Sequence, residues 1–229
     1  MAVYIKEVTT DKELKAFIRF PFSIYRNNPY WVPTLFSDET NTLRRDKNPA
    51  FEYCQARYWL AYKDGRLAGR IAAILNQRYI DIWGNRYLRF GWIDFIDDPD
   101  VSAALLGAVE TWAGEIGMDA VHGPLGFTNM DHAGMLVEGF DELATMATIY
   151  NHPYYPQHLE QLGYGKDTDW VEYEIQVPPE PVEQIARVAN IALRRNKLRL
   201  LQTSNKNELI PYARKFFRLY NEAYKDIYG

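Results

Sequence analysis

Asp94 is the side chain of this sequence best placed for acid–base chemistry. It lies in the middle of an otherwise apolar and aromatic segment, FGWIDFI. If the side chain enters a crevice, burial raises its pKa and suits it to accepting a proton. If it instead shares an outer face with Trp92, we expect it to be solvated or paired with an arginine such as Arg70 or Arg89.

A glycine-rich segment, residues 123–141, supplies a second group of candidates. It follows directly from a predicted strand, where α/β folds tend to bind ligands. Asn129, Asp131 and His132 are candidates for hydrogen bonds to a polar substrate, and His132 is also a candidate base because imidazole titrates near neutral pH. The alternative is an ordered surface loop held by Asx turns.

A strand–helix–strand unit would position these residues. Residues 87–96 alternate large apolar and polar side chains, as a strand does. Apolar residues between 101 and 116 recur at the spacing of an amphipathic helix, Gly117 lies where that helix would end, and residues 119–122 predict the next strand. In such a unit the helix N-terminus faces a crevice.

The loop of this unit resembles the pyrophosphate loop of the GNAT (acyl-CoA N-acyltransferase) superfamily. There, Arg/Gln-x-x-Gly-x-Gly/Ala precedes a leucine pair, and backbone N–H groups hold the CoA pyrophosphate. Aligned on the leucines at 105–106, the pattern places Asp97, Asp100 and Ser102 at the Arg/Gln and the two glycines. Glycine permits a phosphate to approach closely and Asp100 does not, while Asp97, Asp98 and Asp100 repel a diphosphate.

Two interpretations of this loop remain open. In the first, Asp98 or Asp100 caps the helix, as aspartate commonly does. In the second, the loop is degraded but still holds the cosubstrate that the resemblance implies, acetyl-CoA or another acyl-CoA. The second interpretation assigns cofactor contacts to Ile96, Asp97, Val101, Ser102 and Asn151.

Residues 150–175 extend the resemblance. GNAT proteins often end with a helix of the form Tyr-Glu-Lys-Leu-Gly-Phe and a strand, and Leu159 to Tyr164 take that place here. The tyrosine that many members use as general acid is replaced by Leu159, which cannot donate a proton. Tyr154 and Tyr155 are nearby hydroxyls that could substitute as catalytic groups, and packing beside a sheet is their alternative use.

Six stretches are similar to an uncharacterised bacterial GNAT-like family, the YghO-like family. They are NNPYWVP (27–33), NPAFEY (48–53), GRLAGRIAAILN (65–76), FGWIDFIDD (90–98), GPLGFTNMDHAGMLVEGFD (123–141) and HPYYPQHLEQLGYGK (152–166). The first contains Tyr30 and Trp31, which we expect either to roof an acceptor pocket or to pack beneath a loop.

The resemblance covers residues 3 to 177 and implies an α/β (mixed α+β) fold, with a GNAT-like, mostly antiparallel central sheet flanked by helices. Further strands are predicted at 3–8, 57–63, 67–76, 145–150 and 169–177, and further helices at 11–25, 35–45 and 153–162. Asp64-Gly65 predicts a hairpin turn. Pro21 is expected to break or kink the first helix.

Composition narrows the class of protein. The 229 residues carry a formal net charge of −4 without an evident basic stripe, so we expect no nucleic-acid partner. No run reaches the roughly 18 apolar residues that span a bilayer. Cys54, the single cysteine, excludes an intrachain disulfide, and four scattered histidines give no metal-ligand spacing. We predict a cytoplasmic protein with a small-molecule substrate, no metal and no membrane span.

The C-terminal segment repeats the N-terminal one at an offset of 195 residues. Glu13, Leu14, Arg19, Phe22 and Tyr25 match Glu208, Leu209, Arg214, Phe217 and Tyr220. Chance similarity between amphipathic helices is one explanation, and a true repeat is the other. We predict a GNAT-like domain over 1–177, a linker and helix over 178–197, and in 198–229 the first strand (198–203) and helix (207–224) of a second GNAT-like unit. We expect this tail to dock on the first domain or to form a homodimer.

Two classes of function follow. The first is acyl transfer from an acyl-CoA to an amine, in which these residues supply the acceptor site or a weak catalytic site. The second is a non-catalytic GNAT-like domain that binds a small ligand or supports a partner domain. The acidic loop and Leu159 favour the second class for these residues, whereas the resemblance favours the first for the intact protein.

Overall fold

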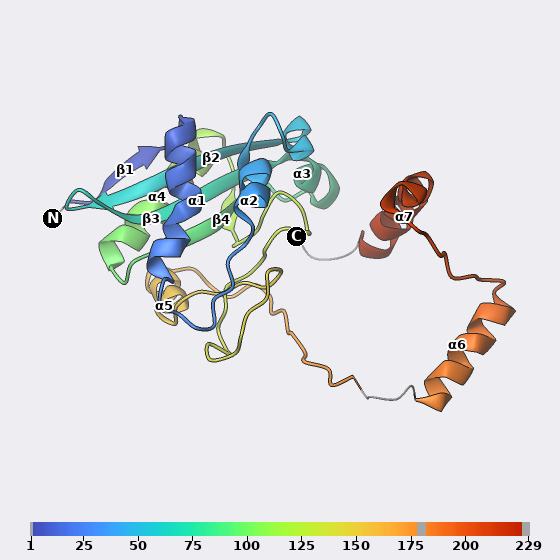
Figure 1. Ribbon diagram of the computed structural model, residues 1–229. Helices are drawn as coiled ribbons and strands as arrows, with labels where there is room; N and C mark the ends of the chain where they lie inside the picture. Colours follow the sequence, from blue (N-terminus) through green and yellow to red (C-terminus); the bar gives the residue numbers. More distant parts are fainter. Residues whose placement is uncertain (1, 178–181, 226–229) are drawn as a thin grey trace. The chain divides into compact units, whose positions relative to one another are not determined.

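The computed structural model describes residues 2–177 and 182–225, which fall into two compact units. Unit 1 ends at Trp170, and unit 2 begins at Val171. Unit 1 contains a five-stranded sheet with helices on both faces, and unit 2 contains two α-helices (Figure 1).

The sheet of unit 1 follows chain order. Its strands are β1 (Tyr4–Glu7), β2 (Cys54–Lys63), β3 (Arg66–Asn76), β4 (Tyr87–Phe95) and β5 (Ala120–His122). The first four pair antiparallel, and β5 pairs parallel to β4 through residues 120–122 alone. Asp64 and Gly65 join β2 to β3 with φ of 54° and 74°, as a tight hairpin turn requires. The expected mixed, mostly antiparallel sheet is confirmed.

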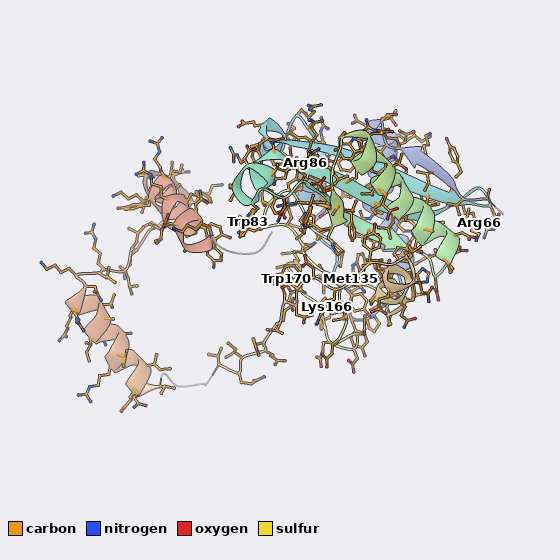
Figure 2. The ribbon with its side chains drawn as sticks, turned by 180° about the vertical axis from the view of Figure 1, so that it is seen from behind. Arg66, Trp83, Arg86, Met135, Lys166 and Trp170 are labelled. Carbon is orange, nitrogen blue, oxygen red and sulfur yellow. The ribbon has the colours of Figure 1, made fainter. Side chains whose placement is uncertain are left out.

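Helices cover both faces of this sheet. The helices α1 (Asp11–Ile24) and α2 (Phe36–Leu43) lie on the face seen in Figure 1, and α4 (Pro99–Glu115) crosses the opposite face, seen in Figure 2. The 3₁₀-helix η1 (Pro49–Glu52) precedes β2, α3 (Gln77–Trp83) follows β3, and α5 (Tyr154–Gln161) comes last in unit 1. The predicted strand–helix–strand unit is therefore β4–α4–β5.

The central strand β3 is buried on both faces. Ile71 and Ala73 pack in one apolar cluster with Val109 and Trp112 of α4. Their neighbours Ala72 and Ile74 pack in a second cluster with Phe17 of α1. This alternation follows from the two-residue period of a strand, and it fixes both helices to the same sheet.

Pro21 was expected to break or kink the first helix, and the structure excludes the break because α1 continues to Ile24. Proline removes the N–H that would bond the carbonyl four residues earlier, here that of Phe17. The Arg70 guanidinium donates to this freed carbonyl oxygen instead, at 3.0 Å. A side chain from β3 therefore replaces the missing bond and allows the helix to continue.

Three predicted strands are absent from the described residues. Residues 145–150 form turns, and residues 169–177 and 198–203 have no strand pairing. Alternating apolar residues become a strand only where a neighbouring strand accepts their backbone hydrogen bonds. The sheet ends at β5, and no described strand lies beside any of these segments.

Unit 2 contains α6 (Glu183–Arg195), the 3₁₀-helix η2 (Lys206–Leu209) and α7 (Ile210–Tyr224). The start of η2 repeats the cap of α1 at the offset of 195. The Glu13 carboxylate accepts the Thr9 N–H at 2.9 Å, and the Glu208 carboxylate accepts the Ser204 N–H at 3.1 Å. The second GNAT-like unit and the docking of the tail remain predictions.

The contact between α4 and the sheet generates a stability prediction. Replacing the buried Trp112 by alanine should lower the free energy of unfolding by about 3–5 kcal/mol, because it opens a cavity under α4. Trp83→Ala, at the half-exposed end of α3 (labelled in Figure 2), is the control and should cost much less. Urea denaturation measures both, and equal losses would contradict the packing described here.

Candidate functional site

A cavity opens beside Asp94 because β4 bulges. The register between β3 and β4 shifts between Arg70 and Ala72, and Trp92 takes a φ of +44°. In a regular strand, successive side chains point to opposite faces. Here the consecutive residues Trp92, Ile93 and Asp94 all line one cavity of about 120 Å³.

Six aromatic rings line this first cavity. They come from α1, the following loop, β4 and the segment ending in α5, and they are Phe22, Tyr25, Trp31, Trp92, Tyr150 and Tyr155. The Tyr25 ring lies 5.2 Å from the Trp31 ring and 5.9 Å from the Tyr150 ring, centroid to centroid. Such a set of ring faces attracts cations as well as apolar groups.

A second cavity of about 230 Å³ shares part of this lining, namely Thr34, Glu39, Trp92 and His132. It adds the carboxylates Asp38 and Asp131. Glu39 Oε2 accepts the Trp92 indole N–H at 2.7 Å and so ties α2 to the bulge. The region shared by the two cavities is therefore both aromatic and acidic.

Asp94 is buried and ion-paired with Arg70. The residue as a whole is 6% exposed, and Arg70 Nε lies 2.7 Å from Asp94 Oδ2. The structure thus combines the two interpretations made for Asp94, since the residue lines a cavity and also pairs with an arginine. Arg89, the other arginine considered, donates to the Gly126 carbonyl at 3.0 Å.

Two tyrosine hydroxyls complete a chain of hydrogen bonds from Asp94. Tyr25 Oη lies 2.8 Å from Asp94 Oδ1 and 3.0 Å from Tyr155 Oη. The Phe95 N–H donates to Tyr155 Oη at 3.1 Å. Every proton has a partner if Tyr155 donates to Tyr25 and Tyr25 donates to the carboxylate.

Both phenols in this chain of hydrogen bonds are neutral. Burial, and then the Asp94 charge, raise the pKa of Tyr25 and of Tyr155 well above the ordinary value. Both Asp94 oxygens are occupied, one by Arg70 and one by Tyr25. The group is therefore better suited to holding α1, β3, β4 and α5 around the cavity than to accepting a proton.

His132 is the group with a free basic nitrogen. It lines both cavities, and its Nε2 lies 3.0 Å from the Met146 carbonyl oxygen. A carbonyl only accepts, so Nε2 must carry a proton and the neutral ring has its lone pair on Nδ1. His132 can therefore accept a proton at Nδ1 from a molecule in the shared region.

The other predicted substrate residues lie in different places. Trp31 lines the first cavity, and Asp131 lines the second, where burial raises the pKa of its carboxyl group. Asn129 is exposed and lines neither cavity. Tyr30 lines neither, and its carbonyl accepts the Ala144 N–H at 2.9 Å.

The acidic loop caps its own helix. Asp98 is the N-cap of α4 and accepts the Asp100 N–H at 3.0 Å, and its carbonyl accepts the N–H groups of Val101 and Ser102. Lys63 pairs with both Asp98 and Asp100. The hydrogen bond from Lys63 to Asp98 lowers the pKa of the Asp98 carboxyl group. The capping interpretation is confirmed, with Asp98 as the cap.

The remaining predicted cofactor contacts are occupied within the protein. Ser102 Oγ lies 2.9 Å from His158 Nδ1, and His158 Nε2 lies 2.9 Å from the exposed Asp97 carboxylate. The Ile96 N–H donates to the Ala68 carbonyl at 2.9 Å. The Val101 side chain is fully buried in the core. These groups leave no open cradle of N–H donors for a diphosphate, so the loop does not fit CoA.

Residues from the segment before α5 and from α5 itself fill the neighbouring space. Asn151 is buried and bonds both the N–H and the carbonyl of Leu136. Tyr154 donates to the Phe95 carbonyl at 2.6 Å, while Tyr155 accepts the N–H of the same residue. β5 pairs with β4 only at Tyr87 to Arg89, and at Phe95 the hydroxyls of Tyr154 and Tyr155 bond the backbone of β4 instead.

Tyr25, Glu39 and Lys63 are among the contributors that were not predicted from the sequence as site residues. Tyr25 lies at the end of α1, and only the proline four residues before it marks that end as unusual. Glu39 has no motif around it. Lys63 is one of many lysines, and its pairing with the loop depends on β2 lying beside α4.

No metal site or spanning helix occurs in the part of the chain that the structure describes. Within residues 2–177 and 182–225, no three His, Cys, Asp or Glu side chains are grouped so that they could hold a metal ion. No helix in these ranges is both long and apolar enough to cross a membrane.

The Arg70–Asp94 pair generates the second prediction. Arg70→Met should lower the free energy of unfolding by about 3–5 kcal/mol, because it leaves the Asp94 carboxylate buried without its cation. Arg66→Met, on the exposed start of the same strand (labelled in Figure 2), should change it by less than about 0.5 kcal/mol. Similar losses in urea denaturation for the two variants would show that the pair does not hold the site together.

Comparison with known proteins gives two relatives in sequence, although no family model matches. Over 172 residues the chain is 37% identical to Protein YghO of Escherichia coli (strain K12), which covers 75% of this chain and 44% of that protein. It is 29% identical over 231 residues to the bacterial ceramide synthase of Caulobacter vibrioides, covering 97% of this chain and 58% of that protein. The chain thus spans about half the length of these curated relatives.

The solved structures that match part of the chain include acetyltransferases. An aminoglycoside acetyltransferase from an uncultured soil metagenomic sample has a TM-score of 0.44 at 10% identity, covering 77% of this chain and 97% of that one. A putative acetyl transferase from Pyrococcus furiosus has a TM-score of 0.44 at 13% identity, covering 75% and 100%. The chain is thus YghO-like in sequence, and its five-stranded, mostly antiparallel sheet with helices on both faces is the architecture that the GNAT resemblance implied.

Proposed function

We propose that unit 1 is the amine-acceptor half of a GNAT-like N-acyltransferase, which transfers an acyl group from an acyl-CoA to an amine. The observation that carries the proposal is the aromatic and acidic region shared by the two cavities. Glu39 lies in the shared region, the second cavity adds Asp38 and Asp131, and Arg70, a cation of the first cavity, is already paired with Asp94. A protonated amine suits such a surface through carboxylate contacts and cation–π attraction.

The proposed reaction needs the amine in its neutral form. An ammonium ion has no lone pair, so a base must take one proton before the nitrogen can attack an acyl carbonyl. His132 Nδ1 supplies that base, because Met146 holds the other ring nitrogen in its protonated state. The nitrogen then forms the new bond to the acyl carbon, the carbon–sulfur bond of the acyl-CoA breaks, and the departing CoA thiolate takes the second proton that the nitrogen loses.

The name of one relative supports a longer acceptor. A ceramide is an amide of a long-chain amino alcohol, so a ceramide synthase joins an acyl group to the nitrogen of such an amine. The cavities here offer apolar walls beside the acidic region, from Ile18, Met135, Leu35, Met130 and Met146. We therefore propose a long-chain amine as the acceptor.

The alternative is a non-catalytic domain that binds a small ligand or supports a partner domain. The self-capped loop at Asp98 and the occupied edge of β4 at Phe95 favour this alternative, because both leave the acyl-CoA side of unit 1 filled. The two functions share the amine pocket and differ in whether His132 moves a proton. In the intact protein, His132→Gln should abolish amide formation, measured by mass spectrometry, and leave amine affinity unchanged if the first function holds. An unchanged rate would support the alternative.

Amine binding itself is the third prediction. Titration with dodecylamine should change the tryptophan fluorescence of the chain, because Trp31 and Trp92 line the first cavity. Dodecanol should bind more weakly, since it lacks the charge. Glu39→Gln should weaken amine binding by about tenfold, or ~1.4 kcal/mol, whereas Glu52→Gln, on an exposed residue outside both cavities, should leave it unchanged. Equal affinity for the amine and the alcohol would contradict the proposed acceptor class.

A further inference from the structure

The cations of this chain concentrate in unit 2. From residue 184 to residue 207 there are six lysines and arginines and no carboxylate, although the whole chain has a net charge of −4. They are Arg187, Arg194, Arg195, Lys197, Arg199 and Lys206. The sequence analysis found no evident basic stripe in the chain as a whole, but this segment is basic throughout. This segment includes most of α6 and the stretch that follows it.

The helix α6 carries an apolar side as well as a basic one. At 3.6 residues per turn, Ile185, Val188 and Ala192 fall on one side and Arg187 and Arg194 on the other. Ile185 is 67% exposed and Val188 is 63% exposed. The following stretch continues the pattern with exposed leucines at 198, 200 and 201.

We propose that α6 binds the surface of an anionic lipid bilayer. A helix with basic residues on one face and aliphatic residues on the other lies in the interface, with its apolar face among the acyl chains and its cations at the headgroups. Long arginine side chains reach the headgroups from such a position. Nucleic acid would match the charges and leave the apolar side exposed to water, so it accounts for only half of the pattern.

This surface is distinct from α7. The start of η2 and α7 repeats the cap of α1, which assigns the apolar side of α7 to the predicted second GNAT-like unit. The residues that match in that repeat, from Glu208 to Tyr220, all lie after α6. The bilayer contact therefore accounts for a helix that the repeat leaves unexplained, and it does not depend on the proposed acyltransferase function.

Vesicle flotation of the full chain tests the proposal. The chain should float with vesicles of equal parts phosphatidylglycerol and phosphatidylcholine, and it should remain behind with phosphatidylcholine alone. Binding should weaken as salt is added, because salt screens the attraction. Replacing Arg194 and Arg195 by glutamine should reduce the partition coefficient by about 25-fold. Val188→Ser should reduce it as well, by removing apolar contact.

A matched control separates this surface from general charge. Arg44 and Arg45 form an arginine pair on unit 1, and changing both to glutamine alters the net charge by the same amount. This control should keep its affinity for the anionic vesicles. Equal losses in the two double variants, equal binding to both kinds of vesicle, or no binding to either would overturn the proposal. Displacement of the chain from vesicles by duplex DNA, with loss of DNA binding in the Arg194 and Arg195 variant alone, would assign the surface to nucleic acid instead.

Discussion

The rest of the site depends on two hydrogen bonds that the Arg70 guanidinium donates. It pairs with Asp94 through Nε and bonds the Phe17 carbonyl through Nη1, so one side chain joins β3 to both β4 and α1. The Phe17 carbonyl is free because Pro21 has no N–H to give it. A buried charge pair stabilises little by itself, but removing one partner is costly, so the arrangement is held in one geometry. Tyr25 and Tyr155 then have fixed positions on the wall of the cavity.

The two sides expected of an acyl-transfer site differ in this unit. In the proposed function the acceptor side is the aromatic and acidic cavity, where His132 can accept a proton. On the donor side, Asp98 and Lys63 occupy the start of α4, and Tyr154 and Tyr155 occupy the edge of β4. Tyr155 takes part on both sides, because its hydroxyl bonds Tyr25 on the cavity wall and accepts the Phe95 N–H at the edge of β4.

Periodicity predicted the parts of the fold that depend on local spacing. The β4–α4–β5 unit, the hairpin at Asp64-Gly65 and the helix α5 all follow from patterns within a few residues of each other. The strands expected at 145–150, 169–177 and 198–203 failed because pairing requires a neighbour that the sequence does not specify. The expectation of a break at Pro21 failed for the same reason. The compensating bond to the Phe17 carbonyl comes from Arg70, which is 53 residues from Phe17 in the chain.

The site shows the same division between local and distant contacts. Asp98 as a helix cap was one of two interpretations of the loop, and an arginine partner for Asp94 was one of two for that residue. Tyr25 and Glu39 could not be chosen from the sequence, because the bulge at Trp92 and the path of α2 bring them to the cavity.

Calorimetric titration of the chain with acetyl-CoA and with a long-chain acyl-CoA tests the central claim most directly. The self-capped loop predicts no saturable binding at micromolar concentrations of either compound. It also predicts a gain in affinity when Asp97→Arg, Asp100→Gly and Ser102→Gly are combined, because the change removes two carboxylates and restores flexible backbone donors. Micromolar or tighter binding by the unmodified chain, abolished by substitutions in this loop, would contradict the claim that the donor side of unit 1 is closed.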